Sequence, residues 1–153
     1  MTAFDVLILG SGLAGQSLAL RLADSLKVAL VTKRTLEDSA SAWAQGGIAA
    51  VLDPAADSIE AHVADTLTAG AGLCSDSATR FVVENGPRVI RWLIDQGVPF
   101  SSDTSSPIGY HLTREGGHSQ RRIIHAADAT GAAVQATLTE QVRAHSNIAS
   151  FEQ

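Results

Sequence analysis

The chain has 153 residues and a mean hydropathy of +0.12, which suits a well-buried α/β protein with a real core. Its formal net charge of −5 and pI of about 5.4 argue against a nucleic-acid surface, which needs a basic stripe. Cys74 is the only cysteine, which excludes a disulfide framework and a thiolate metal cluster and makes a reducing cytoplasm the simplest compartment. We expect no signal peptide and no membrane span, because a strand begins almost at once and the apolar runs are short.

A glycine-rich turn near the amino terminus is the first element with chemical meaning. Residues 4–9 form an apolar run typical of a buried parallel strand, and residues 10–15 read Gly-Ser-Gly-Leu-Ala-Gly. In this G-x-G-x-x-G motif, glycine permits a tight turn, close approach to a pyrophosphate, and close packing of helix on strand. An amphipathic helix to about residue 25 and an apolar strand over residues 27–32 complete a β-α-β unit. A glycine turn without a ligand is the alternative.

The middle of the chain is predicted to hold one long loop followed by helices. The loop covers residues 33–51, which are rich in small residues, and includes a short helix. A helix follows over about residues 58–69. Two more helices are expected at residues 75–84 and 87–96, separated by a break at Asn85-Gly86, with Pro87 as the first helical residue of the second.

The last part of the chain supplies a third strand. After a polar, turn-prone segment at residues 101–107, a helix over about residues 131–144 leads into a strand at residues 147–152. Dinucleotide-binding sheets have the order 3-2-1-4-5, with the glycine turn after the central strand 1. We therefore predict an α/β, Rossmann-like domain with parallel strands 1–3 and helices, in which strand 1 keeps an unpaired edge. Strands 4 and 5 have to come from elsewhere, so residues 1–153 are expected to be the amino-terminal part of a larger protein.

The residues after the second strand bear on the identity of the dinucleotide. NAD-binding units place an acidic residue there, whereas this chain has Lys33 and Arg34. Two basic residues fit either an NADP phosphate site or a dinucleotide held without an acidic residue. Residues 39–50 favour the second interpretation, because their small side chains let the backbone lie flat against a bulky ring and their polar groups suit pyrophosphate and flavin atoms. A plain packing loop is the alternative.

Motifs spread over the whole chain indicate a family. They are residues 10–15, 32–33, 44–50, 62–66, 92–97 and, the most specific, the long run 114–131. In register, these motifs resemble the succinate dehydrogenase/fumarate reductase flavoprotein superfamily, and within it the L-aspartate oxidase family.

The resemblance implies FAD as a non-covalently bound cofactor. It places the glycine turn on the FAD pyrophosphate, Lys33 near the adenosine ribose, and the following small-residue loop along the flavin. Membrane-bound relatives carry a histidine in this loop that bonds covalently to FAD, and Ala40 stands at that position here. The implied cofactor-binding residues are Gly10, Ser11, Gly12, Leu13, Ala14, Gly15, Lys33, Ser41, Ala42, Trp43, Ala44, Gln45, Gly46 and Gly47.

Glu115 is the one candidate catalytic residue that the resemblance assigns to this chain. Succinate and fumarate enzymes have an apolar side chain at this position, whereas aspartate oxidases have a glutamate that faces the substrate amino group. A carboxylate beside an ammonium group distinguishes aspartate from succinate through a charge-assisted hydrogen bond. A surface glutamate in a loop is the alternative. The acid/base arginine and the residues that grip the substrate carboxylates belong to a capping domain and to later segments of the relatives.

Other polar residues have two interpretations each. The basic side chains of the long motif either attract a dicarboxylate or belong to an internal ion-pair network, and we favour a network of Arg121, Arg122 and Asp128. His62 and Asp65 share one helical turn, but no further ligands converge on them, so a structural hydrogen bond is favoured and no metal site is predicted.

The implied reaction is the oxidation of L-aspartate to iminoaspartate, with O2 or fumarate as the acceptor, in de novo NAD biosynthesis. Quinolinate synthase is the channelling partner expected for the family. The capping and C-terminal helical domains are absent from residues 1–153, so we expect no turnover and weak FAD affinity from this chain alone. The alternatives are a fragment of a fumarate reductase or succinate dehydrogenase flavoprotein, which Glu115 and Ala40 argue against, and a non-catalytic nucleotide-binding module.

Overall fold

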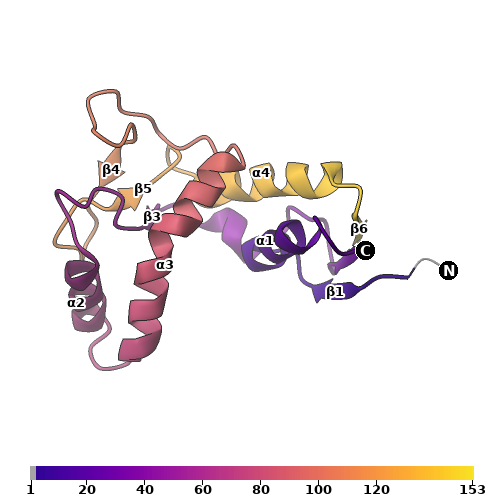
Figure 1. The fold of residues 1–153 in the computed structure, drawn as a ribbon, viewed down its shortest axis with the longest axis horizontal. Coiled ribbons are helices and arrows are strands. Elements are labelled where there is room, and N and C mark those ends of the chain that lie inside the picture. Colours follow the sequence, from indigo (N-terminus) through magenta and orange to yellow (C-terminus); the bar gives the residue numbers. More distant parts are fainter. Residues whose placement is uncertain (1–2) are drawn as a thin grey trace. The chain divides into compact units, whose positions relative to one another are not determined.

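The computed structural model describes residues 3–153, which form two compact units (Figure 1). Unit 1 contains the chain up to Gln45, the short stretch Gln96–Val98 and the final segment Ala129–Gln153. Unit 2 contains Gly46–Asp95 and Pro99–Asp128. No helix in the described part of the chain is long and apolar enough to cross a membrane.

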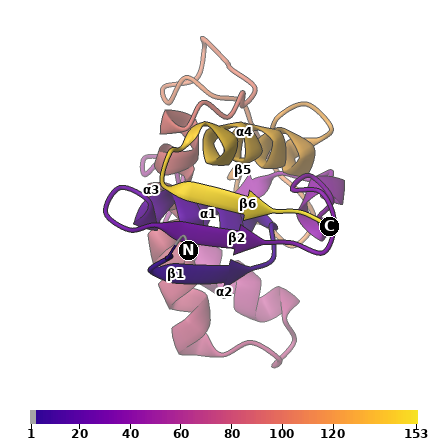
Figure 2. The ribbon, with the colours of Figure 1, turned by 90° about the vertical axis from the view of Figure 1, so that its right-hand side faces the viewer.

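The sheet of unit 1 has three parallel strands in the predicted order (Figure 2). β1 (Val6–Leu9) pairs with β2 (Val28–Val31), and β2 pairs with β6 (Ile148–Phe151). The prediction of an α/β, Rossmann-like arrangement with the glycine turn after β1 is therefore confirmed. Within residues 3–153, β2 is the only strand that pairs with β1, so the other edge of β1 is open, as predicted.

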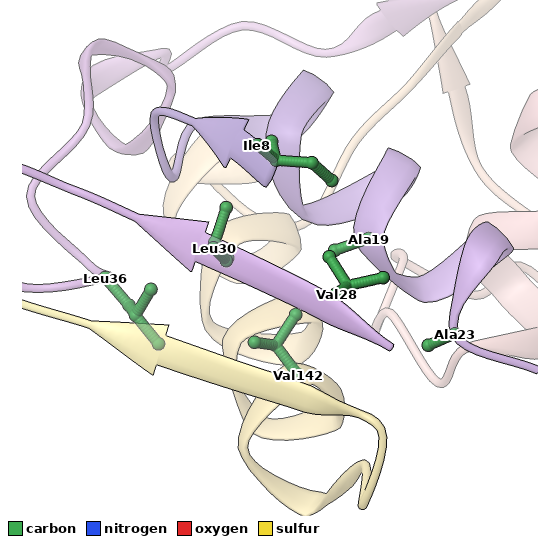
Figure 3. Close-up of a cluster of buried hydrophobic side chains, with 7 residues drawn as sticks. All are labelled: Ile8, Ala19, Ala23, Val28, Leu30, Leu36 and Val142. Carbon is green, nitrogen blue, oxygen red and sulfur yellow. The ribbon is translucent and has the colours of Figure 1, made fainter. Parts of the chain in front are cut away.

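Two helices pack on one face of this sheet. α1 (Leu13–Leu22) follows the glycine turn, and α4 (Thr130–Ala144) leads into β6; the two helices also contact each other. Both were predicted from the sequence. Because side chains alternate along a strand, one face of the sheet meets these helices in a core of Ile8, Ala19, Ala23, Val28, Leu30, Leu36 and Val142 (Figure 3). Leu7 and Leu9 point to the opposite face and are 63% and 77% exposed.

Unit 2 combines a helical pair with a small antiparallel sheet. α2 (Ile59–Ala69) matches the helix predicted over about residues 58–69, and it is capped by the Ser58 hydroxyl, which accepts from the Ala61 N–H at 3.1 Å. The sheet has the order β3-β5-β4. Its strands span only two residues each and show no periodic signal in the sequence, so they were not predicted; they are β3 (Ile48–Ala49), β4 (Leu112–Thr113) and β5 (Ile123–Ile124).

The prediction of two helices around Asn85-Gly86 is wrong. The structure has one helix, α3 (Asp76–Asp95), with Pro87 in its interior. A proline inside a helix removes one backbone hydrogen bond and costs about 3 kcal/mol. The buried side chains Val83, Ile90 and Leu93 follow helical spacing through this point, so burial of one continuous apolar stripe outweighs the local cost.

Candidate functional site

A cleft of about 640 Å³ lies at the carboxyl ends of β1 and β2 in unit 1. Its walls come from the glycine turn, the residues after β2 and the loop that enters the short 3-10 helix η1 (Ala40–Trp43). Doubly wound sheets bind dinucleotides at this end of their strands, beside the first helix. The cleft is lined by Leu9, Gly10, Ser11, Gly12, Val31, Thr32, Lys33, Asp38, Ser39, Ala40, Ser41 and Gln153.

The glycine turn has a backbone that glycine alone adopts without strain. Gly10 has a φ of +102°, and its N–H donates to the Val31 carbonyl at 2.8 Å, which ties the turn to β2. A Cβ atom on Gly15 would collide with the Gly10 carbonyl, so the first turn of α1 packs directly on the loop. Gly12 is the N-cap of α1 and has no side chain to accept from the first helical N–H groups. Those N–H groups, at the positive end of the helix, suit a phosphate.

Two buried glutamines hold the glycine turn from the protein interior. Nε2 of Gln16 on α1 and Nε2 of Gln135 on α4 both donate to the Ser11 carbonyl at 2.9 Å. Gln135 Nε2 also donates to the Leu36 carbonyl at 2.8 Å, and Gln16 Nε2 also donates to the Thr139 hydroxyl at 2.9 Å. These bonds fix the turn and the loop after β2 against both helices, in a buried setting where each bond is strong.

Neither glutamine was predicted as a functional residue, although the sequence contains a signal for both. Gln16 lies on the same face of α1 as the core residues Ala19 and Ala23, and Gln135 lies on the same face of α4 as the core residues Leu138 and Val142. A glutamine on an otherwise apolar helical face has to find buried partners. In this fold the available partners are the carbonyls of the cofactor loops.

Hydroxyl groups complete the floor of the cleft. The buried Ser11 hydroxyl donates to Thr32 Oγ1 at 3.0 Å, and the Ser39 hydroxyl donates to Gln135 Oε1 at 3.0 Å. Lys33 lies at the rim with an exposed side chain. The turn, the helix amino terminus and the cleft therefore fit the pyrophosphate of a dinucleotide.

The residues predicted to line the flavin are divided between the two units. Ser41 lines the cleft, and Ala42 and Trp43 complete η1, where Trp43 is 82% exposed. The Ala44 carbonyl accepts from the Gly131 N–H at 2.9 Å, which ties the loop to α4. The remaining predicted residues follow directly in the sequence: Gln45 ends this stretch of unit 1, and Gly46 and Gly47 begin unit 2.

Within unit 2 the structure brings Glu115 and Gly46 together. A Cβ atom on Gly46 would lie 3.5 Å from Glu115 Oε1, so the exposed carboxylate sits against the Gly46 backbone. Gly47 has a different reason to lack a side chain, because a Cβ atom there would collide with the Ile124 carbonyl on β5.

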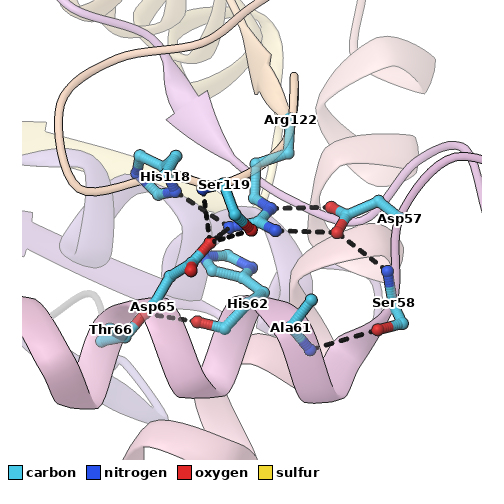
Figure 4. Close-up of polar contacts among 9 residues, drawn as sticks. All are labelled: Asp57, Ser58, Ala61, His62, Asp65, Thr66, His118, Ser119 and Arg122. Carbon is cyan, nitrogen blue, oxygen red and sulfur yellow. Dashed lines mark hydrogen bonds and ion pairs between the residues drawn. The ribbon is translucent and has the colours of Figure 1, made fainter.

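A buried ion-pair cluster lies beside the loop that carries Glu115 (Figure 4). Arg122 Nε and Nη2 donate to the two carboxylate oxygens of Asp57, both at 2.7 Å, and Nη1 donates to Asp65 Oδ2 at 2.5 Å. Asp65 Oδ2 also accepts from the Ser119 N–H and hydroxyl, both at 2.7 Å. An internal network was predicted for Arg122, but with Asp128; its acidic partners are instead Asp57 and Asp65, which the fold of α2 brings next to β5.

The cluster controls the charge of its members. The N–H group of Ser119, followed by the guanidinium of Arg122, lowers the pKa of Asp65 far below its usual value. Burial raises the pKa of Asp57, but hydrogen bonds from Arg122 and from the Ser58 N–H outweigh burial and leave that pKa lowered. Hydrogen bonding to Asp57 in turn raises the pKa of Arg122.

His62 is a buried side chain in this cluster. Burial, followed by the nearby Arg122 charge, lowers the pKa of His62, and its ring lies 5.6 Å from that of His118. Among residues 3–153, no three His, Cys, Asp or Glu side chains are grouped to hold a metal ion. The predicted structural hydrogen bond between His62 and Asp65 is not formed, because Asp65 binds Ser119 and Arg122 instead.

A second histidine pair lies in unit 2. His111 Nδ1 and His125 Nε2 are 2.8 Å apart, and Arg121 Nη2 lies 3.2 Å from His111 Nε2. The pair was not predicted, because His125 lies in the long motif 114–131 but no motif covers His111.

Comparison with known proteins agrees with this geometry. The family model described as FAD binding domain matches residues 5–153. L-aspartate oxidase 1 of Ralstonia nicotianae is 62% identical over 97% of this chain, and the L-aspartate oxidase of Pseudomonas aeruginosa is 54% identical over 97%. The chain spans about 28% of the length of either relative. The resemblance to the L-aspartate oxidases is thereby confirmed.

Solved structures share the fold. An E. coli quinol fumarate reductase matches 97% of this chain with a TM-score of 0.87 and 31% identity, over 26% of its own chain. The Sdh1 complex of Mycobacterium smegmatis matches 97% with a TM-score of 0.85 and 27% identity, over 27% of its own chain. The chain belongs to the FAD binding domain family, and its cofactor is FAD.

Proposed function

We propose that residues 1–153 are the amino-terminal part of the FAD-binding domain of an L-aspartate oxidase. The observation that carries this proposal is the Glu115 carboxylate against Gly46, in a chain that is 62% identical to an L-aspartate oxidase. A carboxylate at that place gives the site a partner for a substrate ammonium group. The capping and C-terminal helical domains belong to the remainder of the complete enzyme.

The uncovered face of the unit 1 sheet supports a larger protein. Leu7, Leu9 and Phe151 are all exposed on this face, and a contiguous apolar surface of this kind marks an interaction site. The open edge of β1 is the place where strand 4 of the dinucleotide-binding order pairs.

FAD is proposed to bind without a covalent bond, since Ala40 cannot form one. The pyrophosphate lies on the glycine turn, at the N–H groups of Ser11 to Ala14, and Lys33 lies near the adenosine ribose. The flavin lies along Ser41 to Gly47. In this arrangement Gln16 and Gln135 hold the turn in the shape that the pyrophosphate needs.

The proposed reaction oxidises L-aspartate to iminoaspartate. Bound FAD would supply the two-electron oxidant: the α-carbon of L-aspartate gives up a hydride and its amino group a proton, with O2 or fumarate as the final acceptor. Glu115 binds the substrate ammonium group through a charge-assisted hydrogen bond and so orients the α-carbon. The acid/base arginine of the family lies outside residues 1–153. We place the enzyme in the cytoplasm, in NAD biosynthesis, with quinolinate synthase as the partner that takes the product.

Two measurements test this proposal. FAD titrated into the purified 153-residue chain is expected to show weak binding by its visible spectrum, and L-aspartate is expected to give no hydrogen peroxide. Turnover is expected in a chimera that joins residues 1–153 to the remainder of the Ralstonia nicotianae L-aspartate oxidase 1. A chimera that folds and binds FAD but oxidises succinate and not L-aspartate contradicts the proposal.

The likeness to solved fumarate reductase structures favours a second candidate, a fragment of a fumarate reductase or succinate dehydrogenase flavoprotein. Glu115→Gln in the chimera separates the two. For an aspartate oxidase, loss of the charged partner lowers the preference for L-aspartate over succinate by about tenfold or more. An unchanged preference favours the second candidate. A protein that binds no flavin in any context is instead a non-catalytic module.

A further inference from the structure

We propose that Asp65 is a positioning residue for Glu115: it holds the loop of residues 114–120 and so fixes the carboxylate that selects the substrate. This inference rests on the proposed function, in which Glu115 binds the ammonium group of L-aspartate. It assigns a role to a side chain on α2, remote in sequence from the loop.

The loop has little regular structure to fix its shape. It connects β4 to β5 and contains Gly116 and Gly117, the second with a φ of +85°. One backbone hydrogen bond lies within it, from the His118 N–H to the Glu115 carbonyl at 3.2 Å. Glycine residues lose more conformational freedom on ordering than other residues, so a loop of this composition needs anchors from outside.

Asp65 supplies the anchor at Ser119. A single oxygen, Asp65 Oδ2, accepts from the Ser119 N–H and from its hydroxyl, both at 2.7 Å (Figure 4). Bonds to an ionised carboxylate are shorter and about twice as strong as neutral ones. Ser119 is therefore fixed to α2 through both backbone and side chain.

Arg122 couples this anchor to a second one. Its Nη1 donates to Asp65 Oδ2 and lies 3.1 Å from His118 Nδ1. Because a guanidinium group only donates, His118 Nδ1 accepts, so the side chain next to Ser119 is held as well. The loop thus has adjacent anchors at His118 and Ser119: Arg122 holds the first, and Asp65 holds the second and also binds Arg122.

Because of Asp57, the anchoring role of Asp65 can be tested without unfolding the protein. Asp57 pairs with Arg122 through two hydrogen bonds and is itself buried, so Arg122 keeps an acidic partner when Asp65 is changed. Asp65 is the less buried of the two carboxylates, with a side chain 19% exposed against 2% for Asp57. Asp65→Ala is therefore expected to release the loop without exposing an unpaired buried charge.

The first arm of the experiment measures amide hydrogen exchange by NMR in the labelled 153-residue chain. In Asp65→Ala, the amides of Ser119 and of the neighbouring loop residues are expected to exchange about tenfold faster or more, because they lose the protection of a hydrogen bond to a charged group. Core amides of α3 keep their rates. Ser119→Ala, which removes only the hydroxyl bond, gives a smaller change, and the control Glu60→Gln, an exposed carboxylate on the same helix, gives none. Unchanged loop exchange, or an equal increase in α3, overturns the proposal.

The second arm measures substrate preference in the chimera. Asp65→Ala is expected to raise the KM for L-aspartate about tenfold or more, by freeing Glu115, and to leave the FAD spectrum and the KM for succinate nearly unchanged. If Glu115→Gln has no effect on L-aspartate, the proposed function fails. If Glu115→Gln weakens L-aspartate binding and Asp65→Ala does not, the positioning role of Asp65 fails and the proposed function stands.

Discussion

Gln135 connects three segments around the cleft at the carboxyl ends of β1 and β2. It donates to the Ser11 and Leu36 carbonyls and accepts from Ser39, and its side chain is buried. Gln135→Leu keeps the volume but leaves these groups without this partner, so we expect the free energy of unfolding to fall by about 2–3 kcal/mol. Urea denaturation followed by circular dichroism measures the change.

The control for Gln135 lies on the same helix. Gln141→Leu removes only an exposed bond to the Gln96 carbonyl at 3.3 Å and is expected to change the free energy of unfolding by less than about 0.5 kcal/mol. Equal losses in the two variants would show that the buried network contributes nothing specific. When FAD is titrated into both variants, Gln135→Leu is expected to bind FAD more weakly than the wild type, and Gln141→Leu is expected to bind it as the wild type does.

The Asp57–Arg122–Asp65 cluster predicts how stability depends on pH. Both carboxyl groups have a lowered pKa in the folded state, so their contribution is complete above the ordinary carboxyl pKa of about 4 and is lost as the pH falls through the lower folded values. We expect the free energy of unfolding to decrease below about pH 4. Asp65→Asn is expected to lose part of this dependence, measured by urea denaturation at a series of pH values. A variant with the wild-type pH profile contradicts the assignment.

Two helical glycines test how elements pack against their neighbours. A Cβ atom on Gly86 in α3 would lie 3.5 Å from the Ala50 Cβ, an ordinary contact, whereas one on Gly131 in α4 would collide with the Ser41 carbonyl of η1. Gly86→Ala is expected to change the free energy of unfolding by less than about 1 kcal/mol, because the ordinary gain of alanine over glycine in a helix is opposed by the clash of the new Cβ with the following Pro87 ring.

Gly131→Ala is the contrasting case. We expect it to destabilise by about 1–3 kcal/mol, because α4 and η1 have to separate to admit the methyl group. Thermal unfolding by calorimetry ranks both variants against the wild type. Equal changes for the two glycines would mean that packing against η1 does not decide the effect of Gly131→Ala.

Elements with a strong periodic pattern were predictable from the sequence, and those held by tertiary contacts were not. β1, β2, β6, α1, α2 and α4 were expected near their observed positions, because apolar runs, periodic apolar residues and a glycine turn mark them locally. The continuity of α3 through Pro87 depends on its buried stripe, and β3, β4 and β5 depend on pairing across distant loops. Local sequence propensity predicts neither the burial of the α3 stripe nor the pairing of these short strands.

The candidate site divides in the same way. The glycine turn and Lys33 could be placed from a motif, and the structure puts both at one cleft. The partners of Arg122 could not, since Asp57 and Asp65 are more than fifty residues away in sequence. The roles of Gln16 and Gln135 could not be predicted, because they depend on how α1 packs against α4.

At the scale of the whole molecule, the exposed face of the unit 1 sheet is the feature that most affects behaviour in solution. Leu9 lies opposite Val31, and Val31 lies opposite Phe151, so apolar side chains form a row across the strands beside the open edge of β1. Edges and apolar faces of this kind favour association with other chains. The net charge of −5 opposes association but does not cover the row.

We therefore expect the purified 153-residue chain to self-associate reversibly as its concentration rises, and the double variant Leu7→Thr, Leu9→Thr to shift this association to at least about tenfold higher concentration. Threonine keeps the preference for strands, so β1 is expected to remain paired with β2. Sedimentation velocity over a concentration series measures the effect, with Leu18→Thr on α1 as the control at a 47% exposed position. If the wild-type chain stays monomeric at every concentration, or if the control reduces association equally, this sheet face is not the surface through which the chain self-associates.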